Sequence, residues 1–136
     1  MFKYIRTMNS CQSVPEIVKI QVPINLEFCE GEICSVNEAG QLTYSIASSY
    51  AKYLVLENKK ENESKAELRC MRILPGMLFE ADLSEDGFEY LAIGNTFELS
   101  TKNSHNLFVG PLIGNDVEII STLNYPKGRK VIVTFI

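Results

Sequence analysis

The one histidine of this 136-residue chain is the first residue to consider for chemistry. His105 follows Ser104 in a short polar stretch, and a serine near a histidine can support nucleophilic catalysis when the two side chains meet. A catalytic triad is assembled in space, however, so adjacency along the chain does not supply one. Polar stretches of this kind are typical of surface loops, and we predict that His105 is an exposed loop residue.

Two carboxylates offer a second kind of chemistry. Glu80 and Asp82 alternate with apolar residues, which would place both on one face of a strand. Paired carboxylates can divide acid–base work between them, but such a polar face is more typical of a strand whose other face is buried. The sequence has no glycine-rich loop of the phosphate-binding type. It therefore predicts a protein that is not an enzyme and needs no cofactor.

The four cysteines, Cys11, Cys29, Cys34 and Cys70, do not form a recognisable metal motif. Cys29 and Cys34 lack the spacing of a Cys-x-x-Cys pair, and the histidine is far away along the chain. A zinc site would have to gather its ligands without a characteristic spacing. Since the N-terminus lacks the features of a secretory signal, we predict reduced, mostly buried thiols and no bound metal.

The charge balance argues against nucleic acid as a direct partner. The formal net charge is −4, and an acidic surface repels phosphate. The densest basic group lies on a predicted turn and contains Tyr125, Lys127, Arg129 and Lys130. It is small beside the aromatic and basic faces of barrels that bind single strands, so we expect a solvated hairpin tip.

No stretch approaches the roughly 18 apolar residues that a membrane-spanning helix requires. The first residues also lack the apolar run and the cleavage site of a signal peptide. We therefore expect a soluble protein that is made in a cytoplasm and has no membrane partner.

The elements that would position these residues are strands. On both sides of Pro75-Gly76, over 66–84, apolar and polar residues alternate with the period of a strand. Proline presets a turn backbone and glycine accepts positive φ, so we predict a hairpin around which the rest of the chain packs. Arg72 falls on the apolar face, so either the register slips there or its charge is accommodated by solvent or a carboxylate.

The rest of the chain reads in the same way. Alternation at 16–22 and 130–136 and an apolar run at 53–56 predict further strands. The polar segments 58–65 and 101–106 are expected to be loops. About ten short strands, with no stretch of helical period, predict an all-β fold. We expect one compact domain, 1–136, a barrel or sandwich of mainly antiparallel strands without an evident internal repeat.

This layout resembles that of the capsid decoration, or cement, proteins and related small accessory virion proteins of tailed bacteriophages. The resemblance lies in a compact chain of short strands with strand-like ends, in turns such as 37–40 and 74–77, and in the lack of a catalytic set. It covers most of the chain as architecture.

The resemblance implies a structural function. The protein would bind the exterior of the capsid in the virion, with the major capsid protein as partner, and form a small homo-oligomer, in particular a trimer. It would be made in the cytoplasm of the host bacterium. Partner contacts are expected at Phe2, Tyr4, Arg6, Lys59, Lys60, Lys127 and Arg129. The alternatives are another phage accessory, of the tail or baseplate, and a nucleic-acid-binding barrel similar to the OB-fold.

Overall fold

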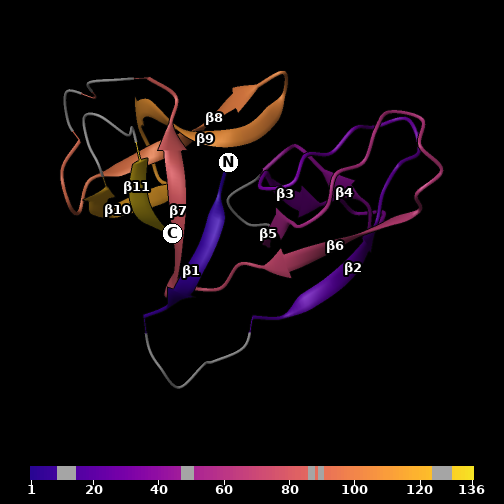
Figure 1. The fold of residues 1–136 in the computed structure, drawn as a ribbon, viewed down its shortest axis with the longest axis horizontal. Coiled ribbons are helices and arrows are strands. Elements are labelled where there is room, and N and C mark those ends of the chain that lie inside the picture. Colours follow the sequence, from indigo (N-terminus) through magenta and orange to yellow (C-terminus); the bar gives the residue numbers. More distant parts are fainter. Residues whose placement is uncertain (9–14, 47–50, 86–87, 89–90, 124–129) are drawn as a thin grey trace. The chain divides into compact units, whose positions relative to one another are not determined.

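The computed structural model describes residues 1–8, 15–46, 51–85, 88, 91–123 and 130–136 (Figure 1). These residues form eleven strands and no helix, which confirms the predicted all-β fold, and hence contain no helix that could span a membrane. The strands are β1 (Lys3–Thr7), β2 (Ile17–Gln21), β3 (Ile33–Val36), β4 (Leu42–Thr43), β5 (Lys52–Val55), β6 (Glu67–Arg72), β7 (Met77–Leu83), β8 (Thr96–Lys102), β9 (His105–Ile113), β10 (Val117–Leu123) and β11 (Lys130–Phe135).

The chain divides into two compact units, each with its own sheet. Unit 1 contains Met1–Ser13, Leu74–Lys102 and Leu107–Ile136. Unit 2 contains Val14–Ile73 and the four residues Asn103–Asn106, which we call the hairpin tip. The expectation of one domain over 1–136 stays a prediction, and the strands are distributed between these two units.

The sheet of unit 1 has the strand order β1-β7-β11-β10-β8-β9. It closes because β7 pairs in parallel with β9 at Asp82 and Leu83, beyond the residues 77–80 that pair with β1. The five strands β7 to β11 therefore form a ring, and β1 lies beside the first part of β7.

The sheet of unit 2 has the order β2-β6-β5-β3-β4, and its neighbouring strands are antiparallel. A parallel bridge between Gln21, which ends β2, and Gln41, which precedes β4, brings the two outer strands together. Buried residues from all five strands, such as Leu42 and Leu68, pack in its core around Phe28. Removal of this apolar surface from water is the main stabilisation of such a unit.

The two units share one topology. We number the strands of each ring in chain order, from β7 in unit 1 and from β2 in unit 2. Neighbouring strands then follow one another in both sheets in the order first, fifth, fourth, second, third. In both, the first and third strands meet in parallel. The strands β2 to β6 therefore correspond in order to β7 to β11, and the chain is a structural repeat of one five-stranded ring.

The pairing registers of the two rings agree. Val55 pairs with Cys70 in unit 2 as Ile119 pairs with Val133 in unit 1, and all four side chains are fully buried. The repeat escaped the sequence analysis because the corresponding positions share burial and backbone geometry rather than residue type. Many apolar side chains can fill one position of a core.

The turn before β3 recurs before β8. Gly31 and Gly94 have positive φ values of 87° and 90°. The N–H of Gly31 donates to the Val55 carbonyl at 2.8 Å, and the N–H of Gly94 donates to the Ile119 carbonyl at the same distance. Glycine adopts positive φ without the penalty that other residues pay, so both turns require it.

The predicted hairpin at Pro75-Gly76 is wrong, although both of its strands exist. β6 pairs with β2 and β5, whereas β7 pairs with β1, β11 and β9. A turn is present, since the N–H of Met77 donates to the Leu74 carbonyl at 3.3 Å, but it connects strands of different units. Alternation identifies a strand and its buried face without identifying the partner of that strand.

The expected loop at 101–106 is also wrong. β8 and β9 are neighbours in the sheet and only Asn103 and Ser104 separate them. Both residues have positive φ, 52° and 72°, as a two-residue type I′ hairpin requires.

Arg72 is exposed because the alternation shifts in β6, where Cys70 and Met71 are both buried. One guanidinium nitrogen of Arg72 lies 3.9 Å from the Glu16 carboxylate. Both expectations for this residue, a slip and an accommodated charge, are therefore met.

Candidate functional site

Side chains with reactive or metal-binding atoms converge at one place in unit 2. The Sγ of Cys29, a carboxylate oxygen of Glu32 and the Nδ1 of His105 all lie within 4.8 Å of one another. Cys29 and Glu32 belong to the turn before β3, and His105 belongs to the hairpin tip. We call these three residues the Cys–Glu–His cluster.

Glu32 is the centre of the cluster and is fully buried. Its Oε1 accepts a hydrogen bond from the backbone N–H of Cys29 at 2.6 Å, and its Oε2 lies 2.8 Å from the Nδ1 of His105. A buried carboxylate is strongly destabilising unless partners of this kind replace its water. The cluster therefore links the turn to the hairpin tip.

The electrostatics of the cluster do not favour a nucleophile. Burial raises the pKa of the Glu32 carboxyl, although hydrogen bonds from the Cys29 N–H and from His105 oppose the rise. Burial, and then the charge of Glu32, raise the pKa of the Cys29 thiol. A thiol with a raised pKa remains protonated and reacts slowly.

Hydrogen bonds and packing hold the hairpin tip in place. The Nδ2 of Asn106 donates to the carbonyls of Ile33 and Tyr44, at 3.0 Å and 2.9 Å. The ring of Tyr44 meets the His105 imidazole edge-on, with 4.9 Å between the ring centroids. The Tyr44 hydroxyl in turn donates to the Glu27 carbonyl. These contacts fix the position of the imidazole beside Glu32.

The prediction of an exposed histidine is wrong, because His105 is only 6% exposed. Its partner Glu32 is 73 residues away in the sequence, so no local pattern relates the two. The sequence did draw attention to Cys29 and His105 as ligand types that lacked a spacing. The fold supplies the proximity that spacing did not predict.

The other described cysteines agree with the prediction of reduced, buried thiols. Cys34 and Cys70 are free and fully buried, and burial raises the pKa of Cys70 to about 12. Cys29 is also free but partly exposed. Cys11 lies outside the described residues.

Glu80 and Asp82 are the polar face of β7, as predicted. Both are half-buried, and the Nζ of Lys130 lies 3.5 Å from the Glu80 carboxylate and 3.3 Å from that of Asp82. Both carboxylates thus share one lysine of the neighbouring strand as their ion-pair partner.

The residues predicted at partner contacts differ in their exposure. On and beside β1, Arg6 is exposed, Tyr4 is half-buried and Phe2 is only 2% exposed. Phe2 is therefore a core residue and is not accessible to a partner in this structure. Lys127 and Arg129 lie outside the described residues.

Lys59 is an exception to the solvated loop expected at 58–65. It is 1% exposed, and its Nζ donates to the carbonyls of Ile24, Leu26 and Lys60 at 2.9, 2.7 and 3.2 Å. Lys60 is exposed, as expected. Lys59 therefore stabilises the backbone at Ile24 and Leu26 instead of facing solvent. Of the two lysines, only Lys60 is accessible to a partner.

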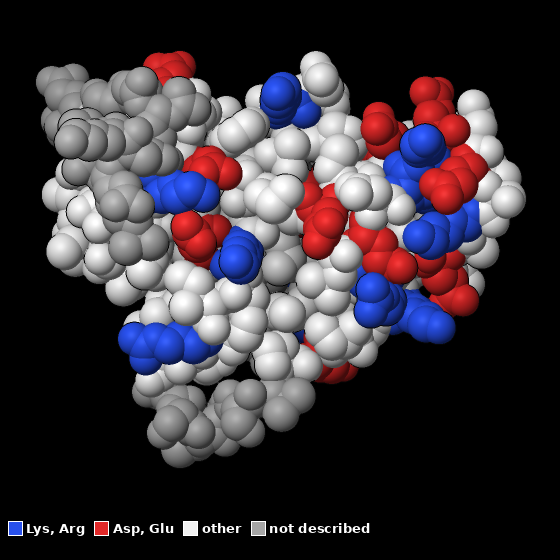
Figure 2. Space-filling model, viewed as in Figure 1, with Lys and Arg blue, Asp and Glu red and all other residues white. Residues whose placement is uncertain are grey.

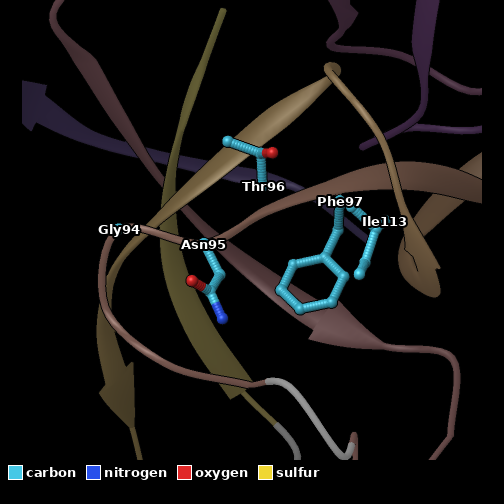
Figure 3. Close-up of a pocket in the computed structure, with 5 residues that line it drawn as sticks. All are labelled: Gly94, Asn95, Thr96, Phe97 and Ile113. Carbon is cyan, nitrogen blue, oxygen red and sulfur yellow. The ribbon is translucent and has the colours of Figure 1, made fainter.

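Unit 1 has a shallow pocket of about 250 Å³ at the start of β8 (Figure 3). It is lined by Gly94, Asn95, Thr96, Phe97 and Ile113. The side chains of Ile113 and Phe97 both border the pocket (Figure 3). Ile113 of this pocket is 67% exposed, and its sequence neighbour Leu112 and the neighbour of Gly94, Ile93, are exposed by 66% and 72%. We call Ile93, Leu112 and Ile113 the apolar rim.

Acidic and basic side chains are interspersed on the face shown in Figure 2. A second shallow pocket, in unit 2, illustrates the mixture, since it is lined by Lys19, Glu57, Lys65, Glu67 and Arg69. Nucleic acid is bound by a continuous basic surface, and the described residues on the face shown in Figure 2 do not form one.

Comparisons with protein-family models, with curated proteins and with solved structures find no match to this chain.

Proposed function

We propose that the protein is a structural virion component that binds the exterior of a bacteriophage capsid and stabilises the head. The observation that carries the proposal is the apolar rim of unit 1. These three large aliphatic side chains are exposed by 66% to 72%, and one of them, Ile113, lines a pocket together with the buried Phe97. Large apolar side chains exposed at and beside a pocket are typical of a site of protein interaction.

The chemistry of the Cys–Glu–His cluster supports binding rather than catalysis. Its carboxylate is already engaged by the Cys29 N–H and by His105, and its thiol has a raised pKa. An enzyme needs convergent polar groups in a pocket that admits a substrate. The pocket in unit 1 is instead lined by aliphatic, aromatic and small polar residues.

A capsid lattice suits a weak apolar contact, because many identical sites on one particle give multivalent stabilisation. A small homo-oligomer, with a trimer as our expectation, would match the local symmetry of the lattice. The major capsid protein is the proposed partner. Tyr4, Arg6 and Lys60 remain predicted partner contacts.

Co-sedimentation with empty capsids tests the proposal. The purified protein should bind saturably, at a fixed ratio to capsid subunits, and should raise the temperature at which the capsids disrupt. Ile113→Asp should abolish binding, because it places a charge in the rim. Ile24→Asp is the matched control, since Ile24 is 58% exposed in unit 2 and outside the rim.

Light scattering of the free protein gives its oligomeric state. Binding that survives Ile113→Asp would overturn the role of the rim. Binding to tails but not to heads would identify a tail or baseplate accessory, and no association with either particle would overturn the virion proposal.

A further inference from the structure

The Cys–Glu–His cluster combines the three ligand types that zinc prefers in proteins. Thiolate sulfur, imidazole nitrogen and carboxylate oxygen all coordinate this ion, and three protein ligands with one water complete its tetrahedral shell. We propose that Cys29, Glu32 and His105 bind one zinc ion. The proposal concerns unit 2 alone and does not depend on the proposed virion function.

The separation of the three ligand atoms suits a single ion. All lie within 4.8 Å of one another. Ligand atoms about 2.0–2.3 Å from zinc are about 3.3–3.6 Å apart in a tetrahedral shell. The 2.8 Å between the Oε2 of Glu32 and the Nδ1 of His105 would open by about half an ångström, as the ion replaces the hydrogen bond between them.

The repeated turn in unit 1 provides an internal comparison. The N–H of Glu32 donates to the Cys29 carbonyl at 3.2 Å, and the N–H of Asn95 donates to the Ala92 carbonyl at 3.1 Å. Cys29 and Glu32 therefore correspond to Ala92 and Asn95, which form the same turn without a thiol or a carboxylate. The backbone does not require the ligand side chains, so their presence in unit 2 needs a separate reason.

Neighbouring residues orient the side chains of the cluster in a way that suits metal binding. The Cys29 N–H occupies one oxygen of Glu32 and leaves the other directed at His105. Tyr44 and Asn106 fix the imidazole and the hairpin tip. Contacts of this kind to ligand residues raise metal affinity. Cys29 is partly exposed, which gives an ion and a water molecule a route from solvent.

Zinc binding can be measured directly on the whole chain. We expect protein treated with EDTA and then dialysed against ZnCl2 to retain one zinc per chain by elemental analysis, and its Tm to rise on zinc addition. Retention of less than a tenth of an equivalent would overturn the proposal. Cobalt(II) provides a second measurement, because a thiolate ligand produces an intense charge-transfer absorption.

Three variants distinguish zinc binding at the Cys–Glu–His cluster from nonspecific zinc binding elsewhere on the chain. Cys29→Ala installs the residue found at the equivalent position of unit 1, so it should fold, lose the cobalt–thiolate band and weaken zinc binding at least about 100-fold. His105→Asn should weaken it similarly. Cys70→Ala, which removes a thiol buried in the hydrophobic core of the same unit, should retain the band and the affinity. A Cys29→Ala variant that binds zinc as tightly as the wild type would overturn the proposal.

Discussion

Gly31 and Gly94 occupy equivalent positions in the two units, with φ values of 87° and 90°, and each donates its N–H to the fourth strand of its ring. The residues that follow them differ. Glu32 is buried in the cluster of unit 2, whereas Asn95 lines the pocket of unit 1. One repeated backbone thus presents two different sites.

Gly94→Ala tests the conformational requirement of this turn. An added Cβ would meet no atom within 4 Å, so the loss of stability comes only from the strain of a positive φ at a residue with a side chain. We expect the free energy of unfolding to fall by about 1–2 kcal/mol in urea titrations. Gly94→Asn is the control and should lose less, because asparagine adopts this conformation more readily. Equal stability of Gly94→Ala and the wild type would contradict the assigned turn.

Lys59→Met tests the buried ammonium group. The substitution preserves the aliphatic part of the side chain but leaves the carbonyls of Ile24 and Leu26 without their donor. We expect a loss of about 2–3 kcal/mol in the free energy of unfolding, measured by urea denaturation. Lys60→Met changes the exposed neighbour and should stay within about 0.5 kcal/mol of the wild type. Similar effects of the two substitutions would contradict the burial of Lys59.

Asn106→Asp tests the attachment of the hairpin tip. The amide of Asn106 donates to two carbonyl oxygens, and a carboxylate of the same shape would face them without a proton to donate. Asn106→Ala should lower the free energy of unfolding by about 1–3 kcal/mol, and Asn106→Asp should lower it further. Denaturant titration of both variants at pH 7 gives the comparison. An aspartate variant that is more stable than the alanine variant would show that the donor role is misassigned.

Glu57→Gln tests an ion pair through its pH dependence. A hydrogen bond from the Arg69 N–H, and then the charges of Lys65 and Arg69, lower the pKa of Glu57 below its ordinary value of 4.5. A group whose pKa is lowered on folding stabilises the protein above its ordinary pKa, and this stabilisation is lost as the pH falls through the lowered value. At pH 7 the variant should be less stable by about 0.5–1 kcal/mol.

The difference between the wild type and Glu57→Gln should disappear in chemical denaturation measured at a pH below the lowered pKa of Glu57, where Glu57 is protonated in both the folded and the unfolded state. Glu61→Gln, at an exposed position of the same unit, should show little effect at either pH. A difference that persists unchanged in acid would exclude the charge of Glu57 as its cause.

The sequence by itself determined the type of secondary structure and most buried faces. The alternation at 16–22 correctly placed Ile20 and Val22 in the core and Ile17 at the surface. The assignment of buried faces succeeds because successive side chains of a strand point to opposite faces. This period of two depends on a single strand and not on its partners. Polar segments were assigned less well, since a two-residue hairpin turn and a loop have similar compositions.

Tertiary structure alone decided which strands pair and which polar residues meet. The strands on either side of Pro75-Gly76 were found correctly, yet they belong to different sheets. Glu32 and His105 meet across 73 residues, and the repeat of the ring is carried by backbone geometry and burial. Pairing and proximity depend on how distant apolar faces are buried together, and no single segment of the sequence contains that information.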